Sequence, residues 1–111
     1  IYPFFIERQS GTIININSID GFKIKPLKAV YCASKYGLKG LTDSLKLEAK
    51  DKNIRVIGVH LSGMKTDMYT ADGNDSKNCM EPLEVAMVIY NASRMYPSLS
   101  VDEITIGRIK Y

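Results

Sequence analysis

The chain has 111 residues, of which 45% are hydrophobic and 24% charged, as in globular rather than disordered or fibrous proteins. Its net charge of +3 is small and its basic residues form no long run, so neither nucleic-acid nor membrane binding is expected. No apolar stretch approaches the ~20 residues that cross a bilayer. Two cysteines and no secretory signal favour a reducing compartment, so we expect a cytoplasmic protein.

The first regular segment along the chain is a β-branched run. Residues 12–17 predict a strand that is largely apolar on both faces, as in a parallel sheet covered on each side. Residues 30–52 then predict a long helix, because Leu38, Leu41 and Leu45 recur with helical spacing while charged residues occupy other positions around it.

Two glycines, Gly37 and Gly40, lie inside this helix, where each costs about 1 kcal/mol relative to Ala. Such a cost usually accompanies close approach of another backbone. We therefore expect both glycines to pack against either the sheet or a partner subunit.

The second half of the chain continues this alternation. Residues 55–61 predict another strand, and Pro82, a favoured first-turn residue, predicts the start of a second helix that ends at Pro97. Residues 103–109 predict a third strand. The order β-α-β-α-β indicates an α/β fold with an open parallel sheet, formed by one domain or one piece of a domain.

Polar loops follow the first two strands, at residues 19–29 and 67–81. Open parallel sheets bind their ligands at this edge, outside the carboxyl ends of the strands. The first loop carries Lys23, Lys25 and Lys28, a cluster that we interpret as a solvated loop rather than an anion site.

No metal site is expected from the sequence. The acidic segment 72–75 resembles part of a calcium loop, but no bidentate Glu follows at the required spacing. Cys32 and Cys79 lie far apart. The single His60 ends the second strand without a nucleophilic Ser or Cys motif, so we interpret it as structural.

Chemistry is most plausible where the long helix opens with Tyr31-Cys32-Ala33-Ser34-Lys35, which places Tyr31 and Lys35 on one helical face. A free phenol is a poor base at neutral pH, but a fixed cation beside it favours the phenolate. This spacing alone is weak evidence for catalysis. A structural Tyr packed at a helix start, beside a solvated Lys, is a more common arrangement than a catalytic pair. Ser18, at the tip of the first strand, adds a hydroxyl that faces the same crevice. Thr66, beyond the second strand, either offers a hydroxyl to a ligand or caps a short helix.

These motifs together resemble the short-chain dehydrogenase/reductase family. Ser18, Tyr31 and Lys35 fall where the family has its catalytic Ser and its Tyr-x-x-x-Lys motif. The flanking residues that also match are 11–21, 31–38, Ser44, Leu45, Glu48, Arg55, Val56, Thr66 and 101–106. The resemblance implies a Rossmann-like, doubly wound parallel sheet and hydride transfer between NAD or NADP and a carbonyl/alcohol substrate.

The resemblance also implies a role for each site residue. Tyr31 exchanges the proton with the substrate oxygen, Lys35 favours the phenolate and holds the nicotinamide ribose, and Ser18 orients the substrate oxygen. Tyr31 and Lys35 would contact the cofactor, together with Thr66 and the backbone near Met64. Members of the family often form homodimers or homotetramers through the long helix and the last strand.

Two departures from the family pattern limit what this chain does alone. Leu61-Ser62 stands where the family has Pro-Gly, and the sequence contains no G-x-G turn to cradle a pyrophosphate. We therefore expect residues 1–111 to be a single partial domain, the C-terminal half of such an oxidoreductase, and inactive alone. The alternative is a non-catalytic remnant, or an oligomerisation module, that lacks the cofactor-phosphate site.

Overall fold

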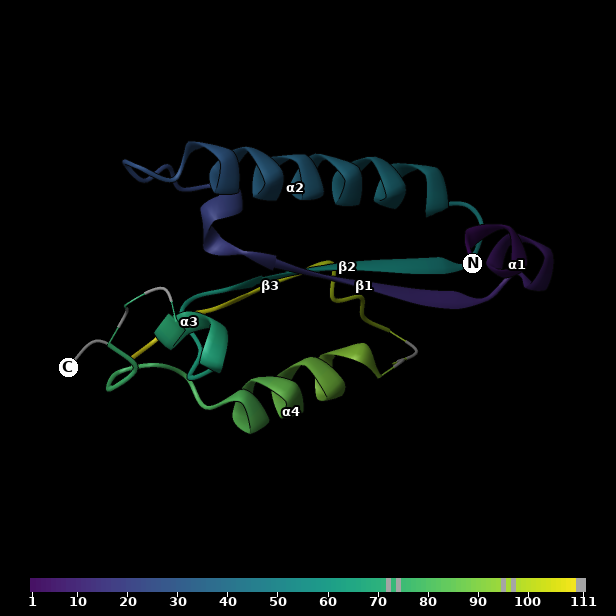
Figure 1. The fold of residues 1–111 in the computed structure, drawn as a ribbon. Coiled ribbons are helices and arrows are strands. Elements are labelled where there is room, and N and C mark those ends of the chain that lie inside the picture. Colours follow the sequence, from purple (N-terminus) through teal and green to yellow (C-terminus); the bar gives the residue numbers. More distant parts are fainter. Residues whose placement is uncertain (72, 74, 95, 97, 110–111) are drawn as a thin grey trace.

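The computed structural model describes residues 1–71, 73, 75–94, 96 and 98–109. Seven helices and strands and one 3₁₀ turn, η1, follow in this order: α1 (Tyr2–Arg8), β1 (Gly11–Ser18), η1 (Ile19–Gly21), α2 (Ala29–Ala49), β2 (Ile54–Leu61), α3 (Asp67–Ala71), α4 (Pro82–Ser93) and β3 (Glu103–Ile106). Figure 1 shows α2 and α4 on opposite faces of the sheet, which makes three layers.

The predicted elements are present, with differences at their ends. The third strand stops at Ile106 rather than at residue 109, and the second helix ends at Ser93. Pro97, expected to end that helix, lies outside the described residues. The second loop contains the short helix α3, which follows Thr66 and agrees with one of the two interpretations of that residue.

The sheet is parallel throughout, in the order β1-β2-β3, so the expected α/β architecture is confirmed. Every residue of the central strand β2 is buried except Arg55, because helices cover both of its faces. Ser18 pairs with Leu61, and Leu61 pairs with Ile106. The carboxyl ends of all three strands are therefore level at one edge of the sheet.

Alternate side chains of β2 enter different cores, as the twofold period of a strand requires. On one face Ile57, Val59 and Leu61 pack against Val85 of α4. On the other face Ile54 and Val56 pack against the end of α2 and against α1. Each of these buried aliphatic side chains contributes about 1.5–3 kcal/mol to folding, so β2 holds the layers together.

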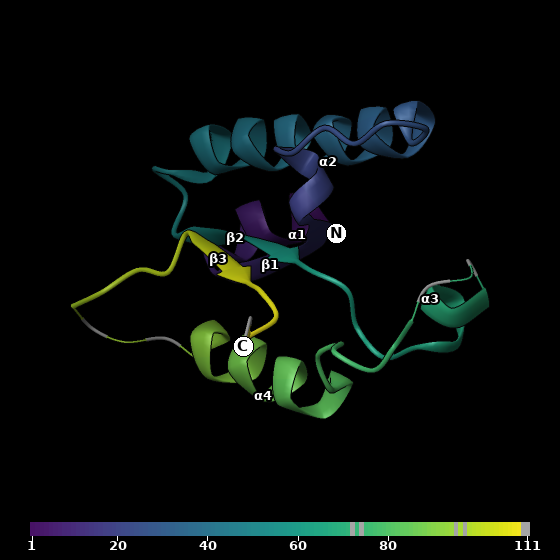
Figure 2. The same ribbon diagram turned by 90° about the vertical axis from the view of Figure 1, so that its left-hand side faces the viewer.

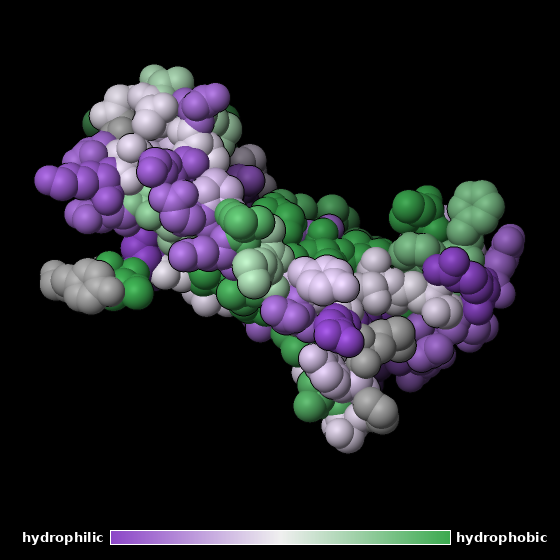
Figure 3. Space-filling view, turned by 90° about the horizontal axis from the view of Figure 1, so that it is seen from below, coloured by the Kyte–Doolittle hydropathy of each residue, from purple (hydrophilic) through white to green (hydrophobic). Residues whose placement is uncertain are grey.

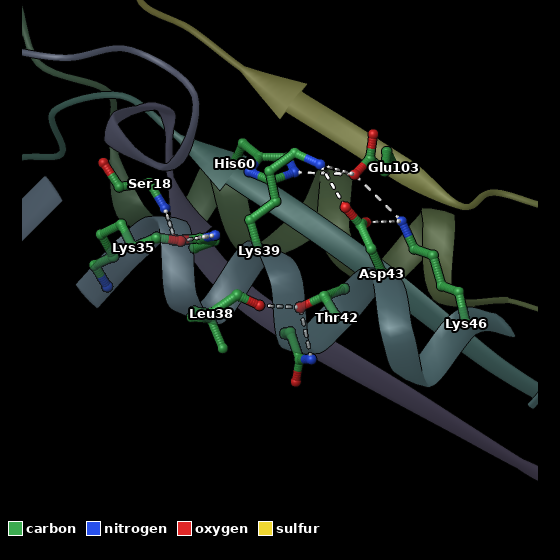
Figure 4. Close-up of polar contacts among 11 residues, drawn as sticks. Ser18, Lys35, Leu38, Lys39, Thr42, Asp43, Lys46, His60 and Glu103 are labelled. Atoms are coloured by element: carbon green, nitrogen blue, oxygen red, sulfur yellow. Dashed lines mark hydrogen bonds and ion pairs between the residues drawn. The ribbon is translucent and has the colours of Figure 1, made fainter. Parts of the chain in front are cut away.

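Two asparagines of β1, Asn15 and Asn17, bond to α2. The expectation that β1 is apolar on both faces is therefore wrong for the face that meets α2. Asn15 Nδ2 donates to Thr42 Oγ1 at 2.9 Å, and Thr42 in turn donates to the Leu38 carbonyl at 2.7 Å (Figure 4). Asn17 Nδ2 donates to the Lys35 carbonyl at 3.1 Å. The buried amide of Asn17 and the partly buried amide of Asn15 are tolerated because they are hydrogen-bonded, and they fix the register of the helix on the strand.

The outward face of α2 carries Gly37 and Gly40. A Cβ added at either position would meet no described atom within 4 Å. The expectation that the sheet approaches these glycines is therefore wrong, since both lie in open space within this chain. Packing against a partner subunit, the other expectation, stays a prediction.

The opposite surface, seen from below in Figure 3, carries hydrophobic side chains in its middle between more hydrophilic ends. On this side α4 buries Val85 but leaves Leu83 and Met87 exposed, at 74% and 58%. No helix in the described part of the chain is long and apolar enough to cross a membrane.

Candidate active site

An open cleft of about 1730 Å³ lies at the carboxyl ends of the strands. Figure 2 views the sheet from this end, with α2 above, α4 below and α3 to one side. All five site residues expected from the sequence line this one cleft: Ser18, Tyr31, Lys35, Met64 and Thr66. Its volume exceeds the roughly 300–1,000 Å³ that surrounds one small ligand, so the cleft has room for two small molecules side by side.

Ser18 is the last residue of β1 and caps the 3₁₀ turn η1. Its Oγ accepts the N–H of Asp20 at 3.2 Å, and its own N–H donates to Asn17 Oδ1 at 2.8 Å. These bonds fix the backbone of Ser18 and orient its oxygen. No described residue accepts the hydroxyl proton of Ser18, which leaves that proton free to be donated within the cleft.

Tyr31 lies in the first turn of α2 with its side chain half-exposed, at 40%. The Lys35 Nζ lies 5.5 Å from the centre of the Tyr31 ring, so the predicted neighbours do meet. A second ammonium, that of Lys28, lies 5.7 Å from the same ring centre. Two cations therefore attract negative charge at this end of the cleft. The sequence analysis placed Lys28 in a solvated loop and did not predict that it lies beside Tyr31.

The turn of α2 that carries Lys35 is held against the end of β1 by Asn17, which is buried and lines the cleft. Gly21 makes this close approach possible. A Cβ at Gly21 would lie 2.9 Å from Asn17 Nδ2 and 3.0 Å from the Lys35 carbonyl oxygen. Figure 4 shows Ser18 and Lys35 brought to the same region from these two elements. The only sequence signal for Asn17 is an amide residue at an alternate position of an otherwise apolar strand.

Thr66 and Met64 form the side of the cleft that follows β2. Thr66 Oγ1 accepts the N–H of Tyr69 at 3.3 Å, so Thr66 caps α3, and its hydroxyl proton is not used in that bond. Met64 pairs with Met80 in a parallel bridge that fixes the segment. Gly63 admits the Tyr69 ring, because a Cβ there would lie 2.8 Å from Cε2 of that ring.

His60 does not line the cleft. Its side chain is only 3% exposed, its ring meets Phe22 edge-on with centres 5.1 Å apart, and its Nε2 lies 3.4 Å from Glu103 Oε1. Lys46 of α2 also reaches Glu103, at 3.2 Å. Figure 4 shows this polar cluster between α2, β2 and β3. The contacts are consistent with a structural His60.

Three charged side chains in this region, Glu103, Asp43 and Lys39, have shifted pKa values. Burial opposes ionisation of Glu103, but hydrogen bonds from Lys46 and His60 outweigh it and hold the pKa of Glu103 below its ordinary value. The hydrogen bond between Lys39 and Asp43 lowers the pKa of Asp43 and raises the pKa of Lys39. Because these side chains are 30–45% exposed, solvent screening limits each pair to about 0–1 kcal/mol.

No group of three or more His, Cys, Asp and Glu side chains able to hold a metal ion occurs among the described residues. Asp72 and Asn74, the loop residues weighed as part of a calcium site, lie outside the described residues.

Comparison with known proteins gives a consistent result. The family described as short chain dehydrogenase matches residues 1–77. Carbonyl reductase family member 4 of Xenopus laevis is 44% identical over 78 residues, which are 70% of this chain and 33% of the relative. A short-chain dehydrogenase/reductase of Vibrio parahaemolyticus superposes with a TM-score of 0.76 at 26% identity, covering 97% of this chain and 49% of that one.

A structure of 4-hydroxyisoleucine dehydrogenase complexed with NADH also superposes, with a TM-score of 0.72 at 27% identity, over 96% of this chain and 49% of that one. The chain thus spans about a third of the Xenopus relative and about half of the two solved structures. The family match over residues 1–77 includes β1, α2 and β2, which carry Ser18, Tyr31 and Lys35. The chain belongs to the short chain dehydrogenase family.

Proposed function

We propose that the protein containing this chain is an NAD(P)-dependent oxidoreductase that interconverts a carbonyl compound and an alcohol. The observation that carries this proposal is the convergence of Ser18, Tyr31 and Lys35 on one cleft at the carboxyl edge of the sheet. Membership of the short chain dehydrogenase family, and the bound NADH of 4-hydroxyisoleucine dehydrogenase, support it.

Each of the three residues has a distinct part in this chemistry. Ser18 donates its hydroxyl proton to the substrate oxygen and so holds that oxygen in place. Tyr31 exchanges a proton with the same oxygen, acting as the general acid in reduction and the general base in oxidation. Lys35 supplies positive charge beside Tyr31 and hydrogen-bonds the cofactor ribose. The geometry supports these roles because Lys35 lies beside the Tyr31 ring and both line the cleft.

The groups in the cleft fit the nicotinamide end of a dinucleotide. Lys35 has no ion-pair partner among the described residues, and the Thr66 hydroxyl retains its proton, so both can donate to ribose or carboxamide oxygens. Met64 lies beside them on the same wall. When bound, the cofactor supplies the hydride. The pyrophosphate end has no counterpart here, since the sequence contains no G-x-G turn.

We further propose that residues 1–111 form the C-terminal half of the oxidoreductase domain and are inactive alone. The share of each relative that the chain covers supports this. The complete protein is proposed to form a homodimer or homotetramer, with the open surroundings of Gly37 and Gly40 accommodating a partner's helix. The second candidate is a non-catalytic remnant or oligomerisation module, which the missing G-x-G turn and the Leu61-Ser62 pair favour.

Lys35→Ala in the complete protein tests the proposal. We expect the variant to lose at least about a hundredfold in kcat with a carbonyl substrate and to raise the KM for NADH or NADPH, since it removes both a positioned charge and a cofactor contact. The matched control is Lys50→Ala, at the far end of α2 and exposed, which should change neither. Equal activity of the two variants would refute the role of Lys35. Absence of any carbonyl reduction in the wild type would favour the remnant.

A further inference from the structure

The loop between η1 and α2, residues 22–28, borders the cleft, and the proposed chemistry gives its lysines no role. We define it as the basic loop. Its lysines Lys23, Lys25 and Lys28 are exposed, as expected for a solvated loop, and all three also line the cleft. Figure 2 shows this segment running past the start of α2 at the end where the strands finish.

The residues that line the cleft have a much higher ratio of basic to acidic side chains than the whole sequence has. Over the whole sequence 15 Lys and Arg are set against 12 Asp and Glu. In the cleft, Lys35 and Arg108 join the three lysines of the basic loop, and Asp20 is the only carboxylate among the described lining residues. A cleft with one sign of charge concentrates ligands of the opposite sign.

Asp20 does not neutralise the other cations of the cleft, because it is already paired with Lys25. Its carboxylate is buried and lies 2.7 Å from the Lys25 ammonium. Among the described residues, Lys23, Lys28 and Arg108 have no ion-pair partner. With Lys35 assigned to the reaction, these three cations remain available to a ligand.

The amino end of α2 adds to the same field. The helix has 21 residues, its N-cap Lys28 makes no side-chain capping bond, and its first turn contains no acidic residue. The first N–H groups of an α-helix have no partner within the helix. In α2 these belong to residues that line the cleft: Ala29, Val30 and Tyr31. The positive end of the helix dipole therefore points toward the space that the lysines surround.

We infer that the substrate of this site is an anion: a carbonyl compound or alcohol that carries a carboxylate or phosphate group a few bonds from the reacting carbon. This rests on the proposed function. The short separation follows from Lys28, whose ammonium lies 5.7 Å from the ring of Tyr31, the group that meets the substrate oxygen. The anionic group is bound by Lys28 and the first turn of α2, and Lys23 and Arg108, which line the same cleft, add positive charge.

Paired substrates in the complete protein test this inference. Acetoacetate is compared with its neutral ethyl ester, and dihydroxyacetone phosphate with neutral dihydroxyacetone, each with the cofactor that supports turnover. We expect kcat/KM to favour at least one anion over its neutral partner by about tenfold or more, a preference that shrinks as salt is raised. Equal kcat/KM within both pairs would overturn the inference while leaving the oxidoreductase proposal intact, and turnover of no carbonyl compound would instead refute the proposed function.

Charge-removing variants locate the effect. Lys28→Gln should lower kcat/KM for the preferred anion about fivefold or more relative to its neutral partner, because any effect of the lost charge on Tyr31 is common to both substrates. The neutral substrate controls for any influence of Lys28 on Tyr31. Lys23→Gln should act in the same direction more weakly, and exposed Lys50→Gln should have no effect. Equal losses for anion and neutral substrate, or a rise in the KM for the cofactor instead, would contradict the assignment.

Discussion

Asn17 of β1 donates its side-chain amide to the backbone carbonyl of Lys35 in α2, with 3.1 Å between nitrogen and oxygen. The bond joins the strand end that carries Ser18 to the helical turn that carries Lys35. It links residues 18 positions apart in the sequence. The separation of the two proposed catalytic residues, Ser18 and Lys35, therefore depends on a buried amide to which the proposal gives no part in the chemistry.

Asn17→Ala is expected to destabilise the complete protein by about 1–3 kcal/mol, because it leaves the Lys35 carbonyl without its buried donor. It should also lower kcat about 10–100-fold, since small misplacements of catalytic groups are costly. Thermal unfolding and steady-state kinetics measure the two effects. Asn15→Ala is the matched control. Asn15 lies on the same face of β1 as Asn17 and also bonds to α2, through Thr42, but it does not line the cleft. A similar loss of kcat in both variants would mean that Asn17 has no special part in positioning.

Gly21→Ala should destabilise the fold by about 1–3 kcal/mol, because its new methyl group would press on Asn17 and on the Lys35 carbonyl. Gly37→Ala introduces the same methyl into open space in the helix and should stabilise a monomer by about 1 kcal/mol. Urea unfolding of the monomeric chain compares the two. If Gly21→Ala were neutral or stabilising, the close packing of η1 on α2 would be wrong.

Glu103→Gln tests the polar cluster through its pH dependence. The folded-state pKa of Glu103 lies below its ordinary value of 4.5, so its ionised form adds stability above that value, and this stability is lost as the pH falls through the lowered pKa. The variant should lose about 0.5–1 kcal/mol at neutral pH, given the exposure of the side chain. The difference from wild type should vanish at acid pH.

Denaturant unfolding at a series of pH values measures this difference. Glu7→Gln, on the exposed side of α1 and with no ion-pair partner among the described residues, is the control and should change stability by less than about 0.5 kcal/mol throughout. A loss in Glu103→Gln that stayed constant down to acid pH would show that the charge of Glu103 is not the stabilising feature.

The sequence predicted what depends on periodicity and on fixed spacing. Alternation of apolar runs revealed the parallel sheet, and the four-residue step from Tyr31 to Lys35 placed both on one face of α2. Asn17 escaped prediction because it bonds to a backbone carbonyl, and such a bond leaves no pattern in its partner's side chain. The lysines of the basic loop are exposed as expected, but their position beside the cleft was not predicted. Whether Lys28 lies at the cleft depends on the path of the loop, which residue types do not determine.

The central claim is that Tyr31 exchanges a proton with the substrate oxygen. Its most direct test is Tyr31→Phe in the complete protein, measuring carbonyl-dependent oxidation of NADH or NADPH together with cofactor affinity by fluorescence titration. Removing one hydroxyl should lower kcat by about 10²–10⁴-fold, the usual contribution of a general acid or base, while the cofactor Kd changes far less than kcat and the melting temperature stays close to wild type. Turnover within a few-fold of wild type would contradict the account.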